Sequence, residues 1–173
     1  MSEIKLINII DEDFVNYKVP TMSLLFPYCS MKCNIEAGRE VCQNTSLCNS
    51  SLIEVSIEAL CERYLKNPIS KAICCYGMEP FDSHIELFNF ISILRHEYHC
   101  NDTIVIYTGY TEDECQRFIK VLKTFDNIII KFGRFIPNSE KKYEELLGVE
   151  LASSNQYAKV INENYTKSKS ARI

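Results

Sequence analysis

The sequence predicts an α/β fold, a partial (open) β/α barrel with a mostly parallel sheet. Short apolar runs rich in β-branched residues alternate with longer segments whose apolar residues recur at helical spacing, which is typical of βαβ units. About four or five such units fit into the 173 residues, too few for a closed eight-stranded barrel. We therefore expect one domain over residues 1–161, followed by a polar, flexible C-terminal tail at 162–173.

The first expected elements are two strands and a long loop. Residues 4–10 are an apolar run of strand length, and residues 23–26 are a second run that Pro27 ends. Residues 28–51 show little periodicity and contain many Asn, Ser and Cys residues. Loops this long inside a compact domain tend to be functional, so we expect this loop to carry part of a site.

The rest of the chain alternates helices with buried strands. Thr111 and Glu114 predict a capping box at the start of the last helix, and Asn67-Pro68 ends the first. The expected helices span residues 53–65, 84–98 and 111–124, and the expected strands span 71–75, 103–107 and 127–132.

Polar segments follow the expected strands. In parallel α/β folds, ligands bind at the carboxyl ends of the strands. We therefore expect four segments that are distant in the sequence to converge on one site: residues 28–44, 76–82, 108–111 and 133–138.

Charge and composition exclude several classes of protein. A formal net charge of −4 gives no global electrostatic case for nucleic acid. No apolar run is long enough to predict a membrane span, and the N-terminal residues lack the pattern of a secretory signal. We expect a cytoplasmic protein, in which the nine cysteines stay reduced and a cysteine cluster binds metal or acts in catalysis.

Three cysteines of the long loop have a spacing that suits a metal centre. Cys29, Cys33 and Cys42 form a C-x3-C-x8-C pattern. Three thiolates can hold three corners of a cubane iron–sulfur cluster and leave one iron open. A structural zinc site prefers four ligands in two close pairs. On spacing alone a cluster, a zinc site and inert cysteines all remain open.

The sequence around these cysteines resembles a known cluster loop. The segment from Phe26 to Cys33, FPYCSMKC, and the segment VCQN at 41–44 look like the cluster loop of radical S-adenosylmethionine (SAM) enzymes. They most resemble the small proteins that activate anaerobic ribonucleotide reductase. That family has its third cysteine where this chain has Glu36, and about six extra residues precede Cys42. Cys48 is the alternative third ligand.

Four further segments match that family in order. Tyr76-Gly77-Met78-Glu79-Pro80 is similar to its Gly-Gly-Glu-Pro motif, with Met78 in place of the second glycine. The others are Tyr107-Thr108-Gly109-Tyr110, Gly133-Arg134-Phe135, and Ala152-Ser153-Ser154-Asn155-Gln156.

The resemblance implies specific roles for these residues. Glu79 would pair with the ammonium group of SAM, although it could also simply cap the following helix. Lys131 or Arg134 would meet the SAM carboxylate, and Lys131 could instead be an exposed charge at a strand end. Tyr107 and Tyr110 are pocket walls or ordinary core. The implied cluster ligands are Cys29, Cys33 and Cys42, and the implied cofactor-binding residues are Val41, Gln43, Asn44, Gly77, Glu79, Thr108, Lys131 and Arg134.

The resemblance also implies an activity, with a barrel of the radical SAM type. The protein would bind a [4Fe-4S] cluster and SAM, cleave SAM reductively and generate a glycyl radical on anaerobic ribonucleotide reductase or another glycyl radical protein. Its electron donor would be a reduced flavodoxin or ferredoxin. Two alternatives stay open: a radical SAM protein with another protein or small-molecule target, and a non-catalytic iron–sulfur or zinc protein. The remaining six cysteines are expected to be packing thiols, and Cys100 with His96 and His99 is either a weak metal site or a polar helix end.

Overall fold

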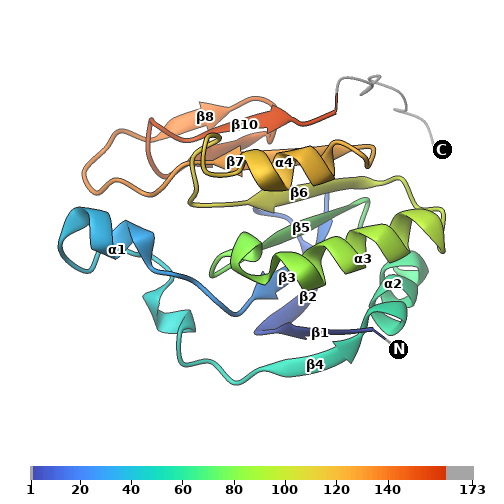
Figure 1. Cartoon of the computed structure of the whole chain (residues 1–173). Helices are drawn as coiled ribbons and strands as arrows, with labels where there is room; N and C mark the ends of the chain where they lie inside the picture. The colour runs from blue at the N-terminus through green and yellow to red at the C-terminus, as the bar shows by residue number, and fades with distance from the viewer. Residues whose placement is uncertain (1, 163–173) are drawn as a thin grey trace.

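The computed structural model describes residues 2–162, so the expected tail lies outside the described residues apart from Asn162. A six-stranded sheet forms the centre of the molecule (Figure 1). Its four inner strands run parallel to one another, and each edge strand is antiparallel to its neighbour. The strands in spatial order are β10 (Tyr157–Val160), β7 (Ile128–Phe132), β6 (Thr103–Tyr107), β5 (Ala72–Gly77), β3 (Thr21–Phe26) and β2 (Asn8–Asp13).

The predicted partial β/α barrel with a mostly parallel sheet is wrong. Two small antiparallel sheets flank the central one, so four of the seven strand pairings within residues 2–162 are antiparallel. The antiparallel edges end the βαβ progression, and the result is an open, mixed sheet rather than a curved parallel one. The small sheets pair β1 (Glu3–Leu6) with β4 (Ile53–Ser56), and β8 (Lys142–Glu144) with β9 (Val149–Leu151).

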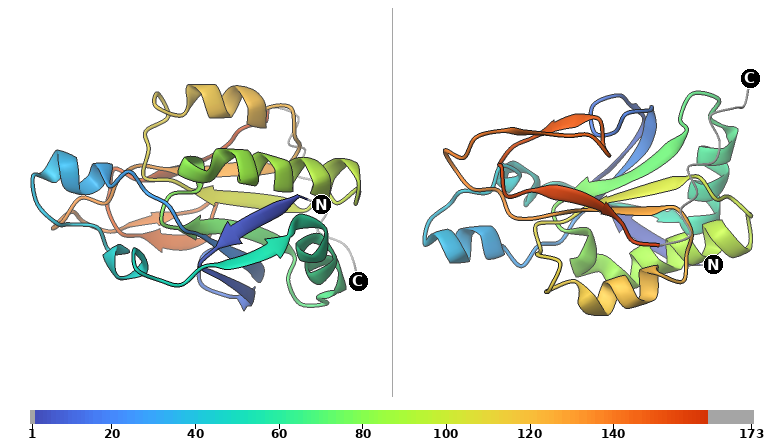
Figure 2. Two further views of the ribbon diagram at one scale, coloured as in Figure 1. Left: turned by 60° about the horizontal axis from the view of Figure 1, so that its bottom comes forward. Right: turned by 90° about the horizontal axis from the view of Figure 1, so that it is seen from above.

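Helices cover one face of the central sheet (Figure 2). They are α2 (Ile57–Lys66), α3 (His84–His96) and α4 (Gln116–Leu122). The inward residues of the helices, such as Phe90, pack in one apolar cluster with alternate residues of the sheet, such as Ile106 and Ile130. β3 and β7 are buried at every position, as expected for strands covered on both faces. Both are mostly apolar, with Thr21, Ser23 and Lys131 as their buried polar residues.

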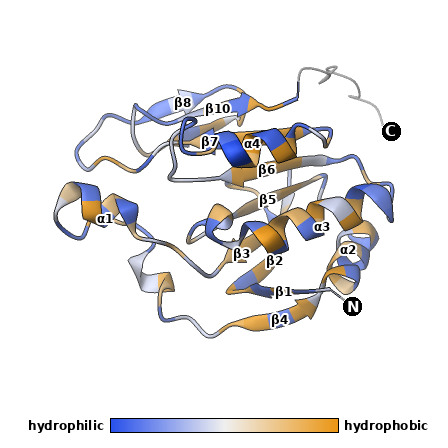
Figure 3. Cartoon of the chain, in the orientation of Figure 1, coloured by the Kyte–Doolittle hydropathy of each residue, from blue (hydrophilic) through white to orange (hydrophobic). Residues whose placement is uncertain are grey.

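The opposite face is covered without helices. The β8–β9 hairpin and the loop after β2 pack on it, and Tyr17, Leu147 and Leu151 join Cys74 and Val105 in a second apolar cluster. Figure 3 shows hydrophobic colour along β6 and hydrophilic colour on β8, whose outer side faces solvent. This arrangement puts a hairpin where the predicted barrel would have had its interior.

Several predicted boundaries shift for local reasons. Residues 53–56, expected as helix, form β4, and Ser56 then caps α2 by accepting a hydrogen bond from Ala59 N at 3.1 Å. The expected strand at 4–10 divides into β1 and β2. The capping box at Thr111 and Glu114 is present, but the regular helix α4 begins later, at Gln116.

The expected irregular loop at 28–51 contains two short helical segments. They are α1 (Lys32–Ala37) and the 3-10 turn η1 (Thr45–Leu47), and a second 3-10 turn, η2 (Pro80–Ser83), precedes α3. α1 lies beyond the ends of the parallel strands (Figure 1). Within residues 2–162, no helix combines the length and the apolar character needed to cross a membrane.

Candidate functional site

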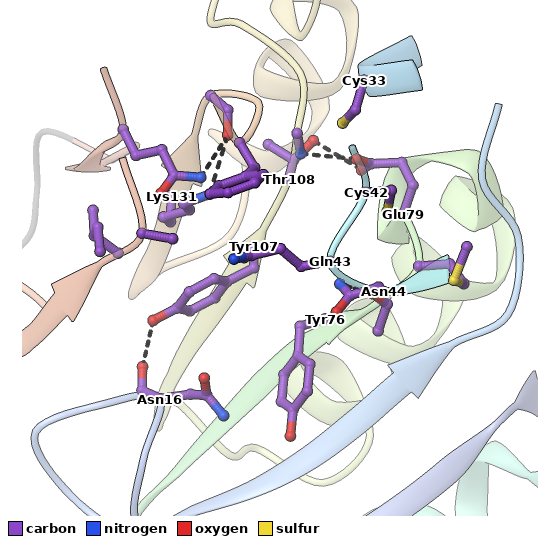
Figure 4. A pocket seen from close by; sticks show the side chains of 18 of the residues that line it. Asn16, Cys33, Cys42, Gln43, Asn44, Tyr76, Glu79, Tyr107, Thr108 and Lys131 are labelled. Carbon is purple, nitrogen blue, oxygen red and sulfur yellow. Dashed lines mark hydrogen bonds between the residues drawn. The ribbon is translucent and has the colours of Figure 1, made fainter. Parts of the chain in front are cut away.

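A cavity of about 390 Å³ lies at the carboxyl ends of β5, β6 and β7. The expected convergence of distant segments at this edge is therefore observed. In Figure 4, Cys33, Cys42 and Glu79 lie on one side of the cavity and Lys131 on the other, with Tyr107 between. The predicted site residues that line it are Cys29, Cys33, Cys42, Gln43, Asn44, Gly77, Glu79, Thr108 and Lys131.

The Glu79 carboxylate is buried in the cavity wall and accepts three hydrogen bonds from the protein. Its Oε1 accepts from the Thr108 hydroxyl at 2.8 Å and from Phe81 N at 3.1 Å, and its Oε2 accepts from Gly109 N at 2.9 Å. Burial raises the pKa of Glu79 to about 7, while these hydrogen bonds act to lower it. Glu79 therefore caps η2 and also lines the cavity, so the two roles considered for it are compatible.

Lys131 is the cation of the cavity. It is only 7% exposed, so the expectation of an exposed strand-end charge does not hold. Its Nζ donates to the carbonyl oxygen of Gly133 at 3.1 Å and lies 5.8 Å from the centre of the Tyr107 ring. Burial lowers the pKa of Lys131 to about 8, and the negative charge of Glu79 opposes that shift. One buried carboxylate and one buried ammonium thus line the same cavity, which suits a ligand with both charges.

Three thiols share this cavity. Cys29, Cys33 and Cys42 are half-buried, whereas Cys48 is exposed and does not line the cavity. Burial raises the pKa of the Cys29 thiol to about 11 and also raises that of Cys33. Since iron binds the thiolate, loading of these thiols would release protons.

The donor set fits an iron–sulfur cluster. Soft thiolates are the ligands that such clusters take, with each thiolate on a different iron. Within residues 2–162, no three His, Cys, Asp or Glu side chains form the compact group that one metal ion needs. The backbone of Gly109 lies between the Cys33 thiol and the Glu79 carboxylate. A Cβ added at Gly109 would lie 3.7 Å from both Cys33 Sγ and Glu79 Oε2.

Asn44 ties the cysteine loop to the sheet. Its Nδ2 donates to the carbonyl oxygen of Gly77 at 2.7 Å, so the loop is anchored at the end of β5. Gly77 has φ +102°, and a Cβ there would lie 2.7 Å from the backbone N of Phe26. The glycine is therefore required by the neighbouring strand β3, and not only by the approach of a ligand.

Two predicted site residues lie outside the cavity. Arg134 forms a bidentate pair with Glu114, at 2.8 and 2.7 Å, and a further ion pair with Glu36 at 3.2 Å. The Arg134 guanidinium holds the pKa of Glu114 well below its usual range. Val41 lies in the loop and does not line the cavity. The structure therefore places Lys131 in the cavity wall, whereas the carboxylates of Glu114 and Glu36 hold the Arg134 guanidinium outside it.

One wall of the cavity is formed by residues to which the sequence analysis assigned no cofactor or metal role. The Tyr107 hydroxyl donates to the carbonyl oxygen of Asn16 at 2.6 Å, so the loop after β2 closes one side. Tyr107 is thus a pocket wall, whereas Tyr110 is buried beside the cavity and bonds Ser30 and Asp82. The wall residues without a predicted site role include Val15, Asn16, Tyr76, Val149, Glu150, Leu151, Ala152 and Gln156.

Five of the other six cysteines are core residues, as predicted. Cys61, Cys74, Cys75, Cys100 and Cys115 are buried. Cys48 is the exception, because it is exposed. The segment with His96, His99 and Cys100 contains no group of three ligands within the part of the chain that the structure describes.

Comparison with protein families agrees with this donor set. A family model described as a 4Fe-4S single cluster domain matches residues 20–158, which include the three cavity cysteines and Glu79. No curated protein sequence matches the chain. Because the match covers most of the 173 residues, the chain belongs to the family of 4Fe-4S single cluster domains.

Proposed function

We propose that this iron–sulfur protein is a radical SAM enzyme that generates a glycyl radical on anaerobic ribonucleotide reductase. The observation that carries the proposal is the meeting of three thiols with a buried carboxylate in one cavity. Three protein ligands leave one position of a cubane cluster open for a ligand of another kind. The resemblance of five segments to the activating proteins supports the choice of SAM as that ligand.

The charges of the cavity support a ligand that carries an amino acid group. Glu79 is available to accept the SAM ammonium through charge-assisted hydrogen bonds. Lys131, on the other side, is available to the SAM carboxylate. When bound, the cluster supplies one electron for cleavage of SAM to methionine and a 5′-deoxyadenosyl radical, which abstracts hydrogen from the target glycine.

The chain's own residues hold and shield the ligand. Asn44 fixes the cysteine loop against β5, and Thr108 orients Glu79. Val149 and Leu151 of the β8–β9 hairpin contribute apolar wall on the far side, which limits access of water to a reactive species. A reducing compartment such as the cytoplasm, with a reduced flavodoxin or ferredoxin as donor, would suit the thiol-rich site.

A second candidate is a radical SAM protein that acts on a different protein or on a small molecule. Met78 favours it, because this side chain lines the cavity where the resembled family has glycine. The side chain reduces the space beside Glu79 and would change which ligand fits.

Anaerobic reconstitution tests the proposal. We expect about three to four irons per chain with broad visible absorbance. Reduction in the presence of SAM should then release methionine and 5′-deoxyadenosine, and mixing with the reductase should give the electron paramagnetic resonance doublet of a glycyl radical. A cluster-loaded protein that leaves SAM intact would contradict the enzyme, and SAM cleavage with no radical on the reductase would favour the second candidate. A colourless, zinc-loaded protein would contradict both.

A further inference from the structure

The segment between the second and third cysteines, residues 34–41, contains no buried residue. α1 contains the second cysteine and the first four residues of the segment after it, and none of the residues of α1 is buried. Its two ends are in the left-handed region, with Met31 at φ 56° and Gly38 at φ 62°. Since no buried side chain holds α1, hydrogen bonds and ion pairs must determine where the chain after it runs.

Asn34 supplies the bonds that return the chain to the cavity. Its Oδ1 accepts hydrogen bonds from Val41 N at 2.9 Å and from Cys42 N at 3.0 Å. One side-chain oxygen therefore receives two consecutive backbone N–H groups across the segment that separates the second cysteine from the third. Asn34 also directly follows Cys33, so its side chain links the backbones of two of the cavity cysteines.

We propose that Asn34 is the positioning residue of the third cluster ligand. By fixing the Cys42 backbone against the first turn of α1, Asn34 sets the separation of the Cys33 and Cys42 thiols and compensates for the long spacing. Partners of this kind orient a ligand without binding metal, and their loss typically weakens metal retention 10–100-fold. The inference rests on cluster binding at Cys42 and is independent of SAM cleavage.

The proposed role depends on the acceptor oxygen of the Asn34 side chain, so two substitutions test whether that oxygen is required. Asn34→Ala removes the acceptor, and Asn34→Asp keeps it. Asn49→Ala is a matched control, because Asn49 is an exposed residue of the same loop. None of these side chains is in the core, and we expect all variants to fold with unchanged thermal stability in the absence of iron.

Two measurements test the inference. In the apo protein, we expect the amide of Cys42 to exchange about tenfold faster in Asn34→Ala than in the native chain or Asn34→Asp. In the reconstituted protein, a chelator should remove iron about tenfold faster from Asn34→Ala than from the native chain or Asn34→Asp.

The results have distinct meanings. Rapid loss in Asn34→Ala, rescue by Asn34→Asp and native behaviour of Asn49→Ala would support the positioning role. Equal retention in Asn34→Ala and the native chain, or an unprotected Cys42 amide in the native apo protein, would overturn it. Failure of the native holoprotein to cleave SAM would contradict the proposed enzyme but not this role.

Discussion

The hydroxyl of Thr108 donates a 2.8 Å hydrogen bond to Oε1 of Glu79, joining the residues that follow β6 and β5. This bond fixes the orientation of a carboxylate that is 3% exposed. It also explains why two motifs almost 30 residues apart act as one wall: the acceptor comes from one strand end and its donors, Thr108 and Gly109, come from the next.

The pKa of Glu79 leads to a pH-dependent affinity. Because that pKa is raised to about 7, we expect SAM affinity to increase as the pH rises through about 7, when the carboxylate forms. Glu79→Gln should bind SAM about tenfold more weakly at pH 8 and lose this dependence. Equilibrium dialysis of reconstituted protein with labelled SAM measures both effects, and Glu145→Gln, on an exposed residue, is the control.

The same shift has a consequence for the stability of the apo protein. The folded pKa lies above the ordinary value of 4.5, so the free energy of unfolding should decrease as the pH rises from about 4.5 to about 7. Glu79→Gln should lack this component of the decrease. Urea denaturation at several pH values checks it, and identical pH profiles for the two proteins would show that Glu79 does not titrate in this range.

The three cavity cysteines and Cys48 should behave differently. We expect Cys42→Ala to lose stable [4Fe-4S] binding and SAM cleavage, because its thiol lines the cavity. Cys48→Ala should retain both, because Cys48 is exposed and outside the cavity. Iron analysis after anaerobic reconstitution provides the measurement, and an inactive Cys48→Ala beside an active Cys42→Ala would reverse the assignment.

Two glycines with positive φ should differ in their tolerance of alanine. At Gly77 a Cβ would lie 2.7 Å from Phe26 N, whereas at Gly38 nothing lies within 4 Å. We expect Gly38→Ala to lower the free energy of unfolding by about 1 kcal/mol through backbone strain alone. Gly77→Ala should lower it by about 3 kcal/mol or more, since the clash adds to the strain. Equal effects in urea denaturation would contradict the close approach of β5 to β3.

The buried Lys131 ammonium should lower the free energy of unfolding of the apo protein, although the same group is proposed to bind the SAM carboxylate. Its folded pKa of about 8 is below the ordinary 10.5, so the free energy of unfolding should rise as the pH increases from about 8 to about 10.5. Lys131→Met should lack this rise, gain about 1 kcal/mol of stability at pH 7 and bind SAM more weakly. Lys123→Met, on an exposed residue, is the control. A variant less stable than the native chain at pH 7 would show that the ammonium is well compensated in its site.

Much of the site could be predicted because parallel strands order their ends. Once 72–77, 103–107 and 128–132 are parallel strands of one sheet, the residues at their carboxyl ends must lie close together, and Glu79, Thr108 and Lys131 do. The fate of Arg134 could not be predicted in this way. It lies at the same edge, but two carboxylates from other segments, Glu114 and Glu36, hold its guanidinium away from the cavity.

The antiparallel parts of the fold were missed for a different reason. Ile53 and Val55 fit a helix as well as a short strand, and the outcome depends on pairing with Leu6 and Ile4, about 50 residues earlier. The strands β8, β9 and β10 are three or four residues long, which is too short for a period to appear. Because these strands were not predicted, neither the covering of the second sheet face by the β8–β9 hairpin nor the cavity wall at 149–152 could be predicted.

The lack of buried side chains in α1 bears on how this loop can evolve. Insertions and deletions between Cys33 and Cys42 would leave the apolar clusters untouched, so selection can vary the length of this stretch freely as long as some side chain recaptures the returning backbone. The packing of the core therefore does not determine the spacing between these two cysteines.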